Sequence, residues 1–131
     1  MQTLIVEDDF TNRIILQEIL QRYGPCHVAV NGKEALAAFE RALETGRRYG
    51  LVCMDIMMPE MDGHEALKEI RLLEAIRGIA PMDRAKIIMI SAQADEANLF
   101  KARAQRCDYF LVKPIHRAKF LDELRRLGLI T

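Results

Sequence analysis

Short apolar segments alternate with longer amphipathic segments along this whole chain. The amphipathic segments repeat apolar residues at helical spacing, as Leu16, Ile19 and Tyr23 do. Residues 49–54 are apolar without alternation, which is expected of a strand covered on both faces. The alternation predicts a doubly wound (βα)5 sandwich, an α/β fold with a five-stranded parallel sheet and helices on both faces. We expect strands at residues 3–7, 26–30, 49–54, 86–90 and 109–112. We expect helices at residues 9–23, 33–44, around 67–77, 95–106 and 118–127.

The length of 131 residues fits one domain, which we expect to span residues 1–131. With 50% hydrophobic and 29% charged residues, the chain can bury one sizeable core. Its 19 basic and 19 acidic residues cancel, so no basic field attracts it to nucleic acid or to an anionic membrane surface. Direct nucleic-acid binding is therefore not expected.

Neither a membrane span nor a secretory signal is expected from the sequence. No charge-free stretch approaches the ~20 apolar residues that a membrane-spanning helix needs, and the first residues lack the basic region of a signal peptide. Both observations favour a cytoplasmic protein. The three cysteines are odd in number and far apart, which indicates reduced thiols.

Polar side chains stand at the carboxyl ends of four expected strands, namely Glu7 and Asp8, Asp55, Ser91, and Lys113. In a parallel sheet these ends meet at one edge, where ligands bind. Three carboxylates in one place would repel each other unless a cation offset them. Mg²⁺ prefers oxygen ligands and is usually held by one or two carboxylates with water and phosphate oxygens. The sequence therefore predicts a magnesium site with Asp8 and Asp55 as ligands.

Four motifs carry these side chains, at residues 6–9 (VEDD), 54–63 (MDIMMPEMDG), 90–92 (ISA) and 112–114 (VKP). With these four motifs in this order, the chain resembles response regulator receiver domains, and the resemblance covers its whole length. The resemblance implies a CheY-like fold of the flavodoxin class. It also implies that Asp55 accepts a phosphoryl group from a sensor histidine kinase or a histidine phosphotransfer protein. The chain would then belong to a two-component phosphorelay, and its only chemistry would be Mg²⁺-dependent self-phosphorylation and autodephosphorylation.

The resemblance implies a role for each residue of the acidic site. Asp55 would be the nucleophile and the modified residue, and Mg²⁺ would be held by Asp8, the Asp55 carboxylate and the main-chain carbonyl of Met57. Glu7 would act mostly through a metal-bound water. Lys113 would neutralise resting Asp55 and later pair with a phosphoryl oxygen. The resemblance further implies a cis Lys113–Pro114 peptide bond.

The resemblance also implies a switch that reads the phosphate. The Ser91 hydroxyl would bind a phosphoryl oxygen, and Phe110 stands where an aromatic side chain moves with it. Phe110 lacks the hydroxyl of the commoner tyrosine, so such a switch would depend on packing alone; Phe110 is alternatively a plain core residue. Tyr109 falls on the opposite face of its strand. The implied signal is a change on the face made by the fourth helix, fifth strand and fifth helix, in a monomer or a phosphorylation-dependent dimer. We expect no output domain after the last expected helix, and therefore expect a downstream effector protein to receive this signal.

Two positions would tune how long the phosphate lasts, Met57 and Gln93, which lie two residues after Asp55 and Ser91. Our hypothesis is that apolar Met57 limits water access to the acyl phosphate. We otherwise assign Met57, Met58 and Met61 to packing, because methionine fills irregular gaps.

Two other functions stay open at this stage. A phosphohydrolase of the haloacid-dehalogenase kind also uses an aspartyl phosphate, but it would need a second acid where Met57 stands. A phosphate-independent interaction module could share the fold, although its usual sign is loss of an acidic residue or of the lysine, and all are present here.

Overall fold

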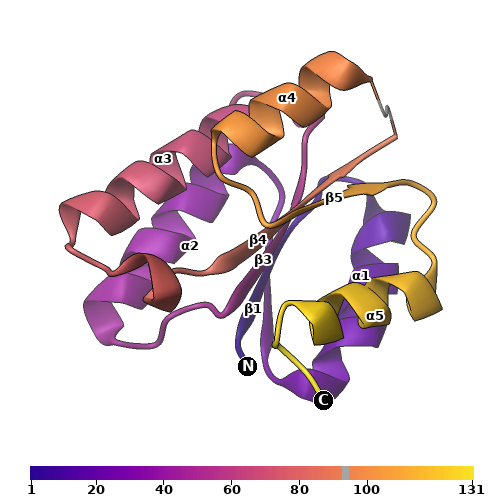
Figure 1. The fold of residues 1–131 in the computed structure, drawn as a ribbon, viewed down its shortest axis with the longest axis horizontal. Helices are drawn as coiled ribbons and strands as arrows, with labels where there is room; N and C mark the ends of the chain where they lie inside the picture. The colour runs from indigo at the N-terminus through magenta and orange to yellow at the C-terminus, as the bar shows by residue number, and fades with distance from the viewer. Residues whose placement is uncertain (93–94) are drawn as a thin grey trace.

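The computed structural model describes residues 1–92 and 95–131, and in it five strands form one parallel sheet (Figure 1). The strand order is β2-β1-β3-β4-β5, and every neighbouring pair is parallel. The order reverses between β1 and β3, and in such sheets ligands bind near that point, beyond the carboxyl ends of the strands. The strands are β1 (Thr3–Val6), β2 (Cys26–Ala29), β3 (Leu51–Asp55), β4 (Lys86–Ser91) and β5 (Tyr109–Val112).

Helices cover both faces of the sheet, as the sequence predicted. Figure 1 shows α2, α3 and α4 on one side and α1 and α5 on the other. No helix in the described ranges has the length and apolarity to cross a lipid bilayer. The helices are α1 (Phe10–Leu20), α2 (Gly32–Thr45), α3 (Gly63–Ile76), α4 (Glu96–Ala104) and α5 (Arg117–Arg126), with short 3-10 turns η1 (Gln21–Tyr23) and η2 (Pro81–Asp83).

The sheet separates two hydrophobic cores, and β3 contributes to both because its successive side chains point to opposite faces. Val52 and Met54 join the core under α2, α3 and α4, while Leu51 and Cys53 join the core under α1 and α5. Every residue of β3 is buried, so the prediction of a strand covered on both faces is confirmed. Asp55, the last residue of β3, is thus delivered from the centre of the protein.

Side-chain caps fix where most helices begin. Asp9, Asn31, Asp62 and Asp95 each accept a hydrogen bond from a backbone N–H of the helix that follows. Such a cap satisfies a donor that the first helical turn leaves unpaired. The loops between strands and helices therefore have defined ends, which matters because they carry the polar residues of the sheet edge.

Several predicted boundaries differ from the structure. β1 ends at Val6, so that Glu7 lies in the loop, and β3 runs over Leu51–Asp55 rather than residues 49–54. α4 is shorter than the predicted 95–106, because Arg106 has a φ of 66° and left-handed backbone cannot continue an α-helix. The apolar face of α4 is thin, since Ala102 is its one buried residue.

Candidate functional site

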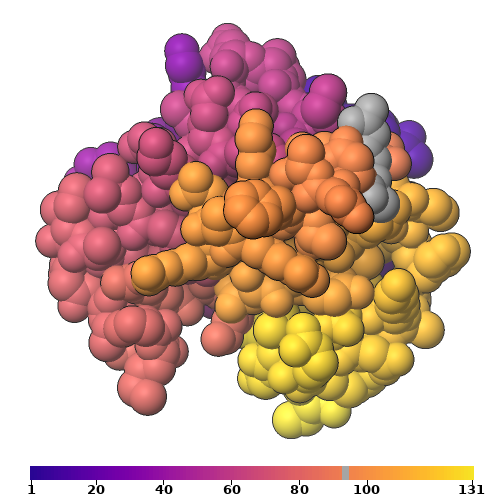
Figure 2. All heavy atoms as spheres, turned by 45° about the horizontal axis from the view of Figure 1, so that its top comes forward, coloured from indigo at the N-terminus to yellow at the C-terminus, as the bar shows by residue number. Residues whose placement is uncertain are grey.

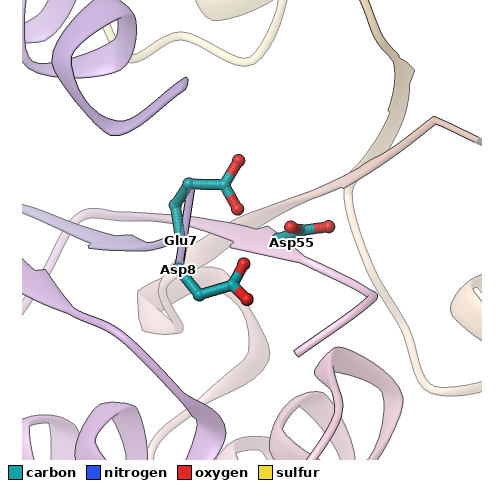
Figure 3. Close-up of side chains that lie close together, drawn as sticks. All are labelled: Glu7, Asp8 and Asp55. Atoms are coloured by element: carbon teal, nitrogen blue, oxygen red, sulfur yellow. The ribbon is translucent and has the colours of Figure 1, made fainter. Parts of the chain in front are cut away.

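Three carboxyl groups meet at the carboxyl ends of β1 and β3 (Figure 3). Glu7 and Asp8 follow β1 directly, and both extend toward Asp55 in Figure 3. An oxygen from each of the three lies within 4.8 Å of the others. Glu7 and Asp55 are buried and Asp8 is exposed. The predicted convergence of these acids at one sheet edge is therefore confirmed.

Lys113 places an ammonium group among these acids. Its Nζ donates hydrogen bonds to Glu7 Oε1 at 3.0 Å and to Asp55 Oδ2 at 3.3 Å. The backbone N–H of Lys113 also donates to the carbonyl of Ser91 at 2.8 Å, which fixes the start of its loop against β4. The Lys113–Pro114 peptide bond is cis, as the resemblance implied. The pairing of Lys113 with Asp55 was predicted from the sequence, but its shorter contact with Glu7 was not.

Burial dominates the electrostatics of this cluster. Burial, together with the negatively charged neighbour Asp55, raises the pKa of Glu7 to about 8, and Lys113 offsets only part of this rise. Burial by itself would lower the pKa of Lys113, but its hydrogen bonds and attraction to Glu7 and Asp55 outweigh that effect and raise the pKa. Without a metal ion, Glu7 is therefore largely protonated at neutral pH, while Lys113 keeps its charge.

The cluster fits a hard divalent cation. Glu7 Oε2 is buried and has no hydrogen-bond partner among the residues that the structure describes, although a buried carboxyl oxygen normally has one. Asp8 adds an exposed carboxylate, open to a hydrated ion. Oxygen ligands of this kind, some of them reached through water, suit Mg²⁺.

The loop after β3 departs from one prediction. The backbone N–H of Met57 donates to Asp55 Oδ1 at 3.2 Å, but its side chain is 64% exposed, so the assignment of Met57 to packing is wrong. Met58 and Met61 do pack against the core, as predicted. Met57 directly follows Ile56, whose N–H is bound to Ile90 of β4, and the chain then turns outward.

The residues of the predicted switch lie on β4 and β5. Ser91 is fully buried and pairs in register with Val112 of β5. Phe110 packs against the core under α2, α3 and α4, whereas Tyr109 packs on the opposite face, as strand alternation predicted. Gln93, the second predicted rate-tuning position, lies outside the described residues.

Phe110 also lines a groove of about 460 Å³ between α4, β5 and α5, together with Leu99, Arg103 and Arg126. Figure 2 shows α4 on the surface of the molecule, with α5 below it. The partly buried Phe110 therefore joins the core to the surface that the resemblance implicated in signalling.

A family model described as the response regulator receiver domain matches residues 3–125. The chain belongs to this family. It is 33% identical to the chemotaxis protein CheY of Bacillus subtilis over 128 residues, covering 94% of this chain and 93% of that one. It is 30% identical to the sensory/regulatory protein RpfC of Xanthomonas campestris over 131 residues, covering 100% of this chain but spanning only 17% of RpfC.

Solved receiver structures share the fold. The receiver domain of the sensor histidine kinase PA1611 from Pseudomonas aeruginosa is 28% identical, with a TM-score of 0.78 over 95% of this chain and 94% of that one. The Saccharomyces cerevisiae receiver domain of Ssk1, solved with the phosphotransfer protein Ypd1, gives 27% identity and a TM-score of 0.83 over 98% of this chain and 88% of that one. The chain is thus a receiver domain of the two-component type, related to CheY and to receivers of histidine kinases, in a family of signalling domains that are generally not enzymes.

The raised pKa of Glu7 predicts how stability depends on pH in the absence of metal. Between pH 4.5 and about 8, folded Glu7 holds a proton that the unfolded chain has lost. The free energy of unfolding should therefore fall as pH rises through this window, by up to about 1.4 kcal/mol per pH unit from this residue. Urea unfolding in a chelating buffer measures it, with Glu7→Gln as the matched variant that cannot titrate. Parallel pH profiles for the two proteins would contradict the prediction.

Proposed function

We propose that residues 1–131 form one phosphoacceptor receiver domain of a two-component phosphorelay, and that Asp55 takes the phosphoryl group. The observation that carries this proposal is the buried Asp55 carboxylate, 3.3 Å from the Lys113 ammonium and grouped with Glu7 and Asp8. A carboxylate so placed is paired with a fixed cation and lies at the open end of a strand. That combination suits a nucleophile for phosphorus.

The transfer step follows from these contacts. One Asp55 oxygen attacks the phosphorus of a phosphohistidine; a P–O bond forms as the P–N bond breaks, and its electron pair goes to the imidazole nitrogen. The transition state spreads negative charge over the phosphoryl oxygens, so fixed cations contribute most of the catalysis. Lys113, already in contact with Asp55 Oδ2, is positioned to pair with one of these oxygens.

Magnesium is the cofactor that this site would hold. Asp8, the Asp55 carboxylate and the main-chain carbonyl of Met57 would be ligands, with Glu7 acting through a metal-bound water. Bound Mg²⁺ would neutralise phosphoryl charge. The similar receiver of PA1611 was solved with a magnesium ion coordinated in its active-site cleft, which supports this assignment. A bound cation would favour loss of the proton that burial holds on Glu7.

The partners we propose are a sensor histidine kinase or histidine phosphotransfer protein upstream and an effector protein downstream. The complex of Ypd1 with the receiver domain of Ssk1 supports the upstream class. We further propose that Ser91 binds the phosphoryl group and that Phe110 passes the change to the α4-β5-α5 face. Action in the cytoplasm, as a monomer or a phosphorylation-dependent dimer, is part of the same proposal.

The phosphate-independent interaction module is the second candidate, and the intact site argues against it. Asp8, Asp55 and Lys113 are all present and lie close together. The haloacid-dehalogenase alternative lacks support, because the family match covers nearly the whole chain and Met57 stands where that class needs an acid.

Acetyl phosphate with Mg²⁺ tests the phosphoacceptor directly. We expect the wild type to gain one base-labile phosphoryl group, detected by intact-protein mass spectrometry and placed on Asp55 by borohydride trapping. Asp55→Asn should gain none, since an amide oxygen is a poor nucleophile. Asp83→Asn, an exposed acid in η2, is the matched control and should behave as the wild type does. Phosphorylation that persists in Asp55→Asn, or none in any protein, would refute the proposal.

The exposed Met57 side chain predicts a long-lived phosphorylated state. Hydrolysis requires water to attack the phosphorus, and an apolar side chain beside Asp55 offers that water no hydrogen bond. Met57→Asn should therefore speed autodephosphorylation several-fold, as followed by decay of the phosphorylated mass after acetyl phosphate is removed. Met57→Leu, which remains apolar, should retain the slow rate. An unchanged rate in Met57→Asn would show that the side chain does not limit hydrolysis.

A further inference from the structure

The first turn of α2 contacts the loop that leaves Asp55. The backbone N–H of Gly32 donates to the carbonyl oxygen of Met61 at 3.2 Å, and Lys33 lies 3.8 Å from the carboxylate of Glu60. Within the described part of the chain, hydrogen bonds and ion pairs between this loop (residues 57–62) and elements other than β3 and α3 come from this turn. The start of α2 therefore supplies the polar contacts that hold the loop from outside β3 and α3.

The support itself is held firmly. Asn31 Oδ1 caps α2 by accepting the N–H of Glu34 at 2.9 Å, and Glu34 Oε1 in return accepts the N–H of Val30 at 3.3 Å. Reciprocal bonds of this kind resemble a capping box, which fixes the first helical turn. Gly32 follows the cap directly, so the end of β2 and the first turn of α2 hold it in place beside the loop.

Gly32 leaves no room for a side chain on this side. A Cβ atom built there would lie 2.7 Å from Met61 O and 2.8 Å from Met61 Cγ. The first of these atoms belongs to the backbone, so relief of the overlap would require the loop to move. Glu60, which precedes Met61, has a φ of 67°. A residue with a side chain keeps this conformation only where its surroundings enforce it.

A displacement of Met61 would be transmitted to Asp55, because the loop is short and is fixed by hydrogen bonds at both of its ends. The N–H of Met57 donates to Asp55 Oδ1 at 3.2 Å, and the N–H of Gly63 donates to the carbonyl of Ile56 at 2.9 Å. Gly63 packs so closely that a Cβ there would overlap the carbonyl oxygen of Asp55. With both ends fixed, a displacement near Met61 is taken up between Met57 and Glu60.

We propose that Gly32 is a positioning residue for the Asp55 site. Because it has no side chain, its backbone can lie against Met61, and this contact sets the path of the loop that carries the Met57 backbone groups. This inference rests on the proposed function. It gives α2, which contributes no group to the acidic cluster, a part in the geometry of that cluster. Small displacements of reacting groups can lower rates by orders of magnitude, so a methyl group at residue 32 is a sensitive probe.

Gly32→Ala tests the proposal in the full chain with acetyl phosphate. We expect the rate of Asp55 phosphorylation to fall by about ten-fold at saturating Mg²⁺. A readout independent of activity and metal is amide hydrogen exchange: the Met57 N–H should exchange faster in Gly32→Ala. Gly50→Ala is the matched control, because its Cβ would lie 3.3 Å from Met1 Cγ, at the opposite end of β3, and both readouts should equal those of the wild type.

Coupling to Met61 separates positioning from a general loss of stability. Met61→Ala removes the overlap with Cγ and leaves those with the carbonyl oxygen and Cβ. The effect of Gly32→Ala on the rate should therefore be smaller, but not abolished, in the Met61→Ala background, which is a departure from additivity. Equal rates and equal Met57 exchange in Gly32→Ala and the wild type would overturn the inference while leaving the phosphoacceptor proposal intact. Failure of the wild type itself to accept phosphate would instead overturn the proposed function.

A second variant decides the matter if Gly32→Ala does not fold. Asn31→Ala removes the cap that holds the first turn of α2 but adds no atom near the loop. We expect a smaller change of the same sign in both readouts, faster Met57 exchange and slower phosphorylation. No change in either readout for a folded Asn31→Ala would refute the role of this turn.

Discussion

The hydrogen bonds from the Lys113 ammonium to Glu7 and Asp55 are the interactions on which the site depends. Both acids are buried at the end of the sheet, and an ionised carboxylate in such a place is costly unless a cation pairs with it. Lys113 supplies that cation to Asp55, while Glu7 meets the same cost by keeping its proton. Under the proposed function, a metal ion that enters the site would replace the proton on Glu7, while Lys113 stays paired with Asp55.

Parallel topology explains how residues so far apart in sequence meet. Glu7 and Lys113 are 106 positions apart, yet each follows the carboxyl end of a strand in one sheet. The burial of β3 on both faces leaves the strand end as the place where an acid can reach solvent and ligands. The contact between α2 and the loop after β3 then extends this arrangement to a helix that carries none of the acidic groups.

The fold and the position of the acidic cluster could be predicted from the sequence, because alternating apolar and amphipathic segments define the fold and parallel strands bring their carboxyl ends together. The cluster of Glu7, Asp8 and Asp55 follows from that rule. The Glu7–Lys113 contact and the exposure of Met57 could not be predicted, since both depend on side-chain packing between distant segments. The same holds for Arg71, which binds buried Glu74 at 2.7 Å and Asp108 at 3.0 Å and so ties α3 to the start of β5.

The stability of Lys113→Met tests most directly whether a cation is what makes the buried acids tolerable. The free energy of unfolding at pH 7 in a chelating buffer should fall by about 3 kcal/mol, the usual cost of leaving a buried charge unpaired. Added Mg²⁺ should restore part of this loss, because either cation can offset the carboxylates. Unchanged stability in the variant, or a loss that Mg²⁺ does not reduce, would contradict the account.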